Sequence, residues 1–162
     1  MTSTLQWLES TGIGTLVRES LYGFPVVVGL HLLGLAVAIG SLVWFDLRLV
    51  GAVLTSVPVS RVYRQMMPWA ASGFVVSFVT GALLFIGYAS SAYVNPYFWL
   101  KMSALVVAGI NAAYYHLVTE AGRGQWDLTA PPPAAVRVAG LVSLLAWTVV
   151  ILSGRAMAYT MY

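Results

Sequence analysis

Apolar stretches long enough to cross a lipid bilayer constrain the fold of this chain more than any other feature. Four of them are present, at about 24–46, 66–88, 96–118 and 136–158. Each is close to the roughly 20 residues that a helix needs to cross a hydrocarbon core of about 30 Å. Hydrophobic residues make up 60% of the 162 residues and charged residues 8%, whereas soluble domains are roughly 45–50% apolar. We therefore expect a single all-α transmembrane domain over residues 1–162, an integral membrane four-helix bundle.

The segment at about 4–20 is predicted to be an amphipathic helix that lies on the membrane surface. Apolar side chains alternate there with polar ones, which is typical of a helix in the plane of the interface. Gly12 and Gly14 indicate a break within it. Proline is favoured in the first turn of a helix, and three prolines are predicted to start spans in this way: Pro25, Pro68 and Pro96.

Composition excludes several classes of function. The chain has no cysteine, so it can form no disulfide, thiolate metal site or iron–sulfur cluster. The net charge of +3 is spread over loops and helix ends, which does not favour nucleic-acid binding. The N-terminus lacks a basic region followed by a cleavable apolar stretch, so no signal peptide is expected. Because the sequence contains no nucleophile–base pair, phosphate-binding glycine loop or carboxylate dyad, we do not expect an enzyme acting alone.

The distribution of basic residues predicts the orientation in the membrane. The face formed by the two connecting loops carries five arginines: Arg48, Arg61, Arg64, Arg123 and Arg137. The opposite face carries three basic residues: Arg18, Lys101 and Arg155. Since cytoplasmic loops are enriched in basic residues, we predict a multi-pass protein of the bacterial inner (cytoplasmic) membrane with both termini on the periplasmic side.

Ionisable residues inside apolar spans are the first candidates for a functional site, because a bilayer penalises buried charge. His31, Lys101 and Arg155 come from the first, third and fourth spans. Counted from the shared outer face at about 1.5 Å per residue, they fall at similar depth, together with Met102. We predict an outer polar layer formed by these residues.

The two histidines of the chain are the residue type that most often binds haem iron, but they are predicted to lie at different depths in the membrane. His31 lies fifteen residues before Asp46, whereas His116 lies four before Glu120. The difference of eleven residues corresponds to roughly 16 Å along the membrane normal. One haem bridged by both histidines of a single chain is therefore not expected. Each histidine can instead hold its own haem with methionine or an open position as second ligand, or only one is a ligand.

The outer layer is the better candidate for a cofactor. His31 is predicted as an axial ligand of haem b, Lys101 and Arg155 as partners of the propionates, and Met102 as a possible sixth ligand. The same residues suit a quinone, whose carbonyl oxygens need hydrogen-bond donors. In the alternative interpretation the two cations extend to the interface and His31 binds a backbone carbonyl.

The inner layer is predicted to be mainly structural. Asp46, Arg48, Arg64 and Glu120 are placed for interfacial ion pairs, each contributing about 0–1 kcal/mol. His116 is predicted as part of an interfacial aromatic belt.

Other features of this layer and of the second and third spans leave three further expectations. In the second span, Gly73, Ser77, Thr80, Gly81 and Tyr88 place small residues on one side, which is expected to be a packing face. In an alternative, His116 is a second metal or haem ligand beside the soft donors Met66 and Met67. Asn111 is expected to join two helices by a hydrogen bond.

Motifs in three of the spans resemble those of a family of small bacterial four-span membrane proteins of unestablished function. The likeness covers roughly residues 20–118 and is carried by Phe24-Pro25, His31-Leu-Leu-Gly34, Asp46-Leu-Arg48, Pro68-Trp69, Thr80-Gly81, Asn95-Pro96, Lys101-Met102, Asn111 and His116. In outline the chain is also similar to copper-resistance D-type proteins and to small membrane cytochromes b. The resemblance implies that His31, Lys101 and His116 belong to the family's pattern.

Three functions follow as alternatives. The first is an electron-transfer subunit with b-type haem that links a periplasmic partner and quinone. The second is a carrier or channel for a small anion or metal ion, with His31, Lys101 and Arg155 as the selective layer. The third is a cofactor-free accessory subunit of a larger membrane complex. Besides the lipid bilayer, the expected partners are such a complex or further copies of the chain.

Overall fold

The computed structural model describes the chain apart from residues 1, 120–122, 129–130 and 161–162. The described part is helical. Its helices are α1 (Thr2–Ser10), α2 (Gly12–Glu19), α3 (Gly23–Val50), α4 (Val59–Gly87), α5 (Ala89–Val94), α6 (Pro96–Tyr114), the π-helix η1 (Tyr115–Thr119), α7 (Arg123–Trp126) and α8 (Ala134–Thr160).

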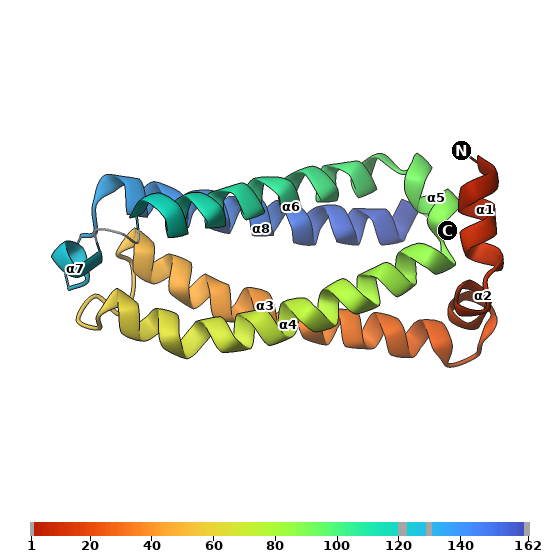
Figure 1. Ribbon diagram of the computed structural model, residues 1–162, viewed down its shortest axis with the longest axis horizontal. Helices are drawn as coiled ribbons and strands as arrows, with labels where there is room; N and C mark the ends of the chain where they lie inside the picture. The colour runs from red at the N-terminus through yellow and green to blue at the C-terminus, as the bar shows by residue number, and fades with distance from the viewer. Residues whose placement is uncertain (1, 120–122, 129–130, 161–162) are drawn as a thin grey trace.

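Four long helices run alongside one another in two pairs (Figure 1). The helix α3 packs along α4, α6 packs along α8, and α3 also contacts α8. We call the end where α3 and α6 begin the terminal end, because the N- and C-termini lie there (Figure 1). The opposite end, where α3 and α6 finish and α7 lies, is called the loop end.

Three of these helices are long and apolar enough to cross a membrane, namely α3, α4 and α8. Large apolar side chains point outward from each of them, as Leu33, Phe78 and Leu145 do, and such surfaces require a nonaqueous surrounding. The chain is therefore a multi-pass membrane protein with lipid-facing helices. The helix α6 is shorter and carries Lys101 and Asn111, which lower its mean hydropathy, although its outward face also exposes Ile110.

Helix boundaries follow local sequence signals at three positions. Pro25 lies in the first turn of α3, and Pro96 is the first residue of α6, as expected from the missing proline N–H. Asn95 caps α6, since its side-chain oxygen accepts a hydrogen bond of 2.9 Å from the backbone N–H of Tyr97. Gly51 ends α3 in the left-handed conformation, at φ 84°, which glycine adopts without a steric penalty.

The predicted start of the second span is wrong. The helix α4 begins at Val59 and places Pro68 in its interior, not in its first turn. The polar stretch 60–65 is thus helical and extends α4 beyond its apolar part. A proline inside a helix removes one backbone hydrogen bond. Pro68 is exposed, and the helix continues through it.

The predicted segment at about 4–20 is helical and forms two helices, α1 and α2. The predicted break at Gly12 and Gly14 is wrong, because both glycines lie inside α2 and the helices separate at Thr11. The Thr11 hydroxyl accepts a hydrogen bond of 3.2 Å from the Gly14 N–H and so caps α2. Both helices lie across the terminal end (Figure 1). Glu9 ties α1 to the start of α5 by accepting a hydrogen bond of 2.7 Å from the Ser90 N–H. The interfacial arrangement is supported by exposed apolar side chains such as Trp7.

Close approach of backbones defines the interface between α3 and α4. A Cβ atom on Gly73 would lie 2.5 Å from the backbone nitrogen of Ala38 and 2.6 Å from the carbonyl oxygen of Gly34. A Cβ atom on Gly34 would in turn lie 2.7 Å from the Ser77 hydroxyl oxygen. Small residues allow this approach, as at many helix contacts in membranes. The small-residue face of the second span is therefore a packing face.

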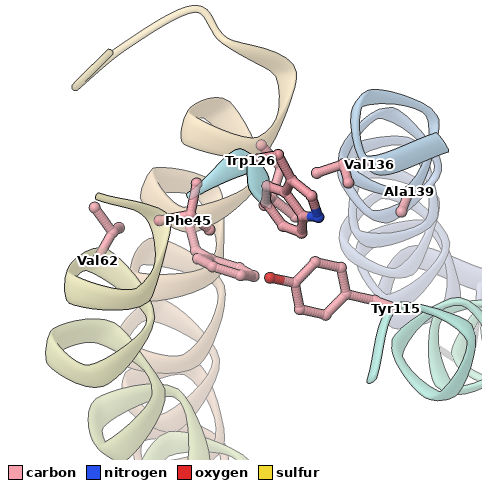
Figure 2. Close-up of a cluster of buried hydrophobic side chains, with 8 residues drawn as sticks. Phe45, Val62, Tyr115, Trp126, Val136 and Ala139 are labelled. Atoms are coloured by element: carbon pink, nitrogen blue, oxygen red, sulfur yellow. The ribbon is translucent and has the colours of Figure 1, made fainter. Parts of the chain in front are cut away.

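A buried cluster joins the loop-end segments of α3, α4 and α8 with η1 and α7 (Figure 2). Phe45 of α3 packs edge-on against Tyr115 of η1, with ring centroids 5.6 Å apart. Trp126 of α7 lies between them and α8, where Val136 completes the cluster. The short helix α7 thus places an aromatic residue over the loop end of the bundle and closes its core there.

The third span ends differently from the prediction of one regular helix to residue 118. It changes at Tyr115 from α-helix to the π-helix η1. A π-turn contains an extra residue and so changes the register of the side chains that follow. Tyr115 is buried and His116 is exposed. The predicted interhelical hydrogen bond of Asn111 is confirmed, because its side-chain amide donates to the Ala139 carbonyl of α8 at 2.9 Å.

Candidate functional site

The histidine of α3 is held by α4. Nδ1 of His31 lies 3.0 Å from the backbone oxygen of Ser77 and 3.1 Å from the hydroxyl oxygen of Thr80. A carbonyl oxygen can only accept a hydrogen bond, so Nδ1 carries the proton and donates it. The Thr80 hydroxyl donates to the Val76 carbonyl at 2.6 Å, which leaves its oxygen to accept from His31. The predicted contact of His31 with a backbone carbonyl is therefore present.

This hydrogen bond determines what the other ring nitrogen can do. With the proton on Nδ1, Nε2 of His31 carries a lone pair, and it makes no hydrogen bond within the described part of the chain. The missing side chain of Gly81 leaves room for the imidazole ring, because a Cβ atom at this position would lie 3.2 Å from Cε1 of His31. An imidazole fixed by a carbonyl on one nitrogen, with the other available, is the usual state of a metal-ligating histidine.

Lys101 of α6 lies at the same level of the bundle. Its side chain is partly buried and passes beside Gly154 of α8, where a Cβ atom would lie 3.8 Å from Nζ. The positive charge of Lys101 acts on the ring of His31. Among the described residues, Lys101 forms no ion pair. Lys101 is thus close enough to His31 for its charge to act on the ring, and its side chain also packs against α8.

Arg155 makes its contacts within α8 and not with His31 or Lys101. Its guanidinium is exposed, donates a hydrogen bond of 3.0 Å to the Tyr159 hydroxyl, and stacks 4.7 Å from the centroid of that ring. Both residues belong to the last turns of α8. Arg155 therefore occupies the rim of the terminal end. Met102, the next residue after Lys101, is partly buried.

His116 belongs to the other end of the bundle. Its ring packs edge-on against Tyr63 of α4, with centroids 5.7 Å apart, and against Tyr115, with centroids 5.4 Å apart. The helices α3 and α6 run in the same direction. His31 therefore lies near the terminal end and His116 at the loop end (Figure 1). No group of three or more histidine, aspartate or glutamate side chains converges within the described residues.

The predicted ion pairs of the inner layer are corrected where the structure describes them. The carboxyl of Asp46 and the guanidinium of Arg48 are buried, with residue exposures of 3% and 0%. Arg48 donates to backbone oxygens, that of Val57 at 2.8 Å and that of Asp127 at 3.4 Å. In the described chain the ion pairs are made by Arg18, with Glu9 and Glu19.

The directions of Asp46 and Arg48 explain why the predicted ion pairs do not form. Neighbouring residues two apart on a helix point to different sides, so Asp46 and Arg48 face α8 and the loop before α4 respectively. Glu120, the other predicted acid, lies outside the described residues.

The sequence analysis did not name the partners of His31. Ser77 and Thr80 are three residues apart and share one helical face, and this spacing was the feature that could have indicated them.

Comparison with known proteins identifies a family whose function is unknown. No curated protein matches the chain, and no solved structure matches it either. One family model matches residues 5–160, which includes all four long helices. The chain therefore belongs to DUF6644, a family of unknown function.

Proposed function

We propose that this chain is a membrane electron-transfer subunit that binds b-type haem through Nε2 of His31. The proposal is carried by the hydrogen bond from Nδ1 of His31 to the Ser77 carbonyl, at 3.0 Å. That bond fixes the tautomer in which Nε2 has a lone pair for a metal, and it orients the ring as a carbonyl partner commonly does for a metal-binding histidine. Haem would supply one-electron chemistry, and an axial histidine is a common way for proteins to hold it.

Further residues at this level suit the same group. Lys101 is a cation inside the bundle without an ion-pair partner in the described chain, and a haem propionate would provide its counter-charge. Met102 would be a second residue able to hold the haem, and Arg155 would meet a propionate only by leaving Tyr159. His116 is assigned no part in this site, because it lies at the loop end.

The position of His31 suggests the direction of electron flow. His31 lies in the part of α3 near the terminal end. We propose that this end faces the periplasm of a bacterial inner membrane, because the arginines are concentrated at the loop end and basic residues favour the cytoplasmic side. A haem there would be within reach of a periplasmic partner or of quinone in the outer leaflet.

The spectrum of the purified protein tests the haem assignment. Chain purified in detergent from cells supplied with haem is expected to give a b-type α-band when dithionite-reduced and air-oxidised spectra are subtracted. Pyridine haemochrome analysis is expected to give about one haem per chain. His31→Ala is expected to lose nearly all of this haem, because Nε2 is the protein's ligand. His116→Ala is the matched control and is expected to keep it.

The outcomes separate the alternatives. Full haem content in a folded His31→Ala protein, judged by size-exclusion chromatography and circular dichroism, would contradict the ligand assignment. A flat spectrum of the wild-type chain would end the cytochrome proposal. Lys101, which lacks an ion pair in the described chain, would then favour the second candidate, a carrier for a small anion. Thermal stability of the colourless protein with and without added anion would test that candidate.

We also propose that α6 is the fourth span of the bundle. Its 19 residues correspond to about 28 Å at helical rise, and its outward face is apolar. Because the chain has no cysteine, single cysteines report topology without background. Ser91→Cys, before α6, and Gln125→Cys, after it, replace exposed residues. We expect a membrane-impermeant maleimide to label the first from the periplasm and the second only after the cells are opened.

A third cysteine serves as the control for this experiment. Ser56→Cys lies in the exposed loop between α3 and α4 at the loop end and is expected to behave like Gln125→Cys. Labelling of Ser91→Cys and Gln125→Cys from the same side would show that α6 does not cross the membrane. Labelling of all three in the reverse sense would keep the four spans and invert the orientation.

A further inference from the structure

One acidic side chain is enclosed by the bundle and takes no part in the proposed haem site. Asp46, near the loop end of α3, is 3% exposed. Its Oδ2 atom is buried and has no hydrogen-bond partner. Within the described part of the chain, the carboxyl also forms no ion pair. An isolated ionised carboxylate in such surroundings costs several kcal/mol, whereas a neutral carboxylic acid costs much less.

Residues of α8 cover Asp46. A Cβ atom on Gly140 would lie 2.9 Å from the backbone oxygen of Asp46, so the two helices touch there. Ser143, one turn further along α8, is buried and lies beside the Asp46 carboxyl. One hydroxyl and one carboxyl are too few oxygen ligands for Ca²⁺ or Mg²⁺, which take about six or more.

Charged and titratable groups on the neighbouring elements do not neutralise this carboxyl by an ion pair within the described chain. On α3, Arg48 turns to the Val57 carbonyl. On α8, Arg137 is exposed, and on α4 Arg64 is exposed as well. The aromatic groups nearest in the fold, Tyr63 of α4 and Tyr115 of η1, pack edge-on against Phe45.

We propose that Asp46 is a reversible proton-binding site between α3 and α8. A proton from a hydronium ion at the loop end binds to the carboxylate, forming an O–H bond and releasing water. The neutral acid is compatible with the close contact at Gly140. Loss of the proton leaves a negative charge that favours entry of water between α3 and α8. The site is independent of the haem proposal, because His31 lies near the other end of the bundle.

Dicyclohexylcarbodiimide tests this site in the full-length chain. The reagent partitions into apolar regions and forms a stable N-acylurea with protonated carboxyls. Mass spectrometry of the detergent-solubilised protein is expected to find the adduct at Asp46. Above the pH at which half of the Asp46 carboxyls are protonated, the rate of adduct formation is expected to fall about tenfold per pH unit, because only the protonated form reacts. Asp127 and Glu9 are internal controls and are expected to stay unlabelled, because donors or arginine hold their carboxylates.

A variant of the neighbouring hydroxyl sharpens the test. Ser143→Ala removes the polar side chain beside the carboxyl and leaves apolar surroundings that favour the neutral acid, so it is expected to raise the labelling rate at a fixed alkaline pH about tenfold. Asp46→Asn must abolish the adduct. Absence of labelling in the folded protein at every pH, with labelling of the unfolded chain, would overturn the proposal. A rate independent of pH would do the same, and suppression by sodium at fixed pH would assign the site to a metal cation instead.

Discussion

Replacing Gly73 by alanine is expected to lower the free energy of unfolding by about 3 kcal/mol, the upper part of the usual range for overpacking a core. The added Cβ atom would lie 2.5 Å from the backbone nitrogen of Ala38 and 2.6 Å from the carbonyl oxygen of Gly34. Both are backbone atoms, so no side chain can rotate away, and α3 and α4 must separate. Reversible unfolding by dodecyl sulfate in mixed micelles, followed by circular dichroism, measures the loss.

Matched glycines in the same helix bundle serve as controls for this result. Gly29 and Gly40 lie on α3, and a Cβ atom on either would meet nothing within 4 Å. Because alanine is the better helix former by about 1 kcal/mol, Gly29→Ala and Gly40→Ala are expected to be neutral or slightly stabilising. Equal losses in all three variants would mean that the α3–α4 contact does not limit stability.

The second large effect is expected at Arg48. Methionine there preserves much of the side-chain volume but removes the bond from Nε to the Val57 carbonyl and that from Nη2 to the Asp127 carbonyl. The Val57 carbonyl loses its donor, at about 1–3 kcal/mol, whereas the Asp127 carbonyl keeps the backbone N–H of Val59 at 3.0 Å. Arg48→Met is therefore expected to destabilise the chain by about 2 kcal/mol, measured by the same unfolding assay. The segment 51–58 is expected to become more sensitive to protease.

Arg64 provides the comparison, because it is also a loop-end arginine but is exposed. Arg64→Met is expected to change the free energy of unfolding by less than about 0.5 kcal/mol, as for most surface positions. If Arg48→Met has an equally small effect and leaves the protease sensitivity of 51–58 unchanged, the buried guanidinium does not hold this loop in place.

Hydrophobic runs and turn residues determined much of the architecture directly. A run of about 20 apolar residues has few alternatives to a helix, because lipid provides no hydrogen-bond partners for the backbone. Pro25 and Pro96 marked helix starts, because the first turn leaves the backbone N–H that proline lacks without a partner in any case. The helix α4 was longer than its apolar part, since polar residues 60–65 lie beyond the hydrophobic stretch and still continue the helix.

Depth along the helices could also be counted from the sequence. That count placed His31 beside Lys101 and separated His31 from His116, because helical rise is nearly constant. It could not say which way a side chain points around its helix axis. Arg155 was grouped with His31 on depth, yet it bonds Tyr159 at the rim.

What the sequence by itself determined is therefore the helical membrane character, the approximate spans and the level of each polar residue. Only the tertiary structure decided which polar groups meet. It placed the Ser77 carbonyl on Nδ1 of His31, turned Arg48 to the Val57 carbonyl, and enclosed Asp46 against Gly140. The physical reason is that hydropathy and helical rise act along one chain segment, whereas hydrogen bonds and burial depend on how neighbouring helices rotate and approach one another.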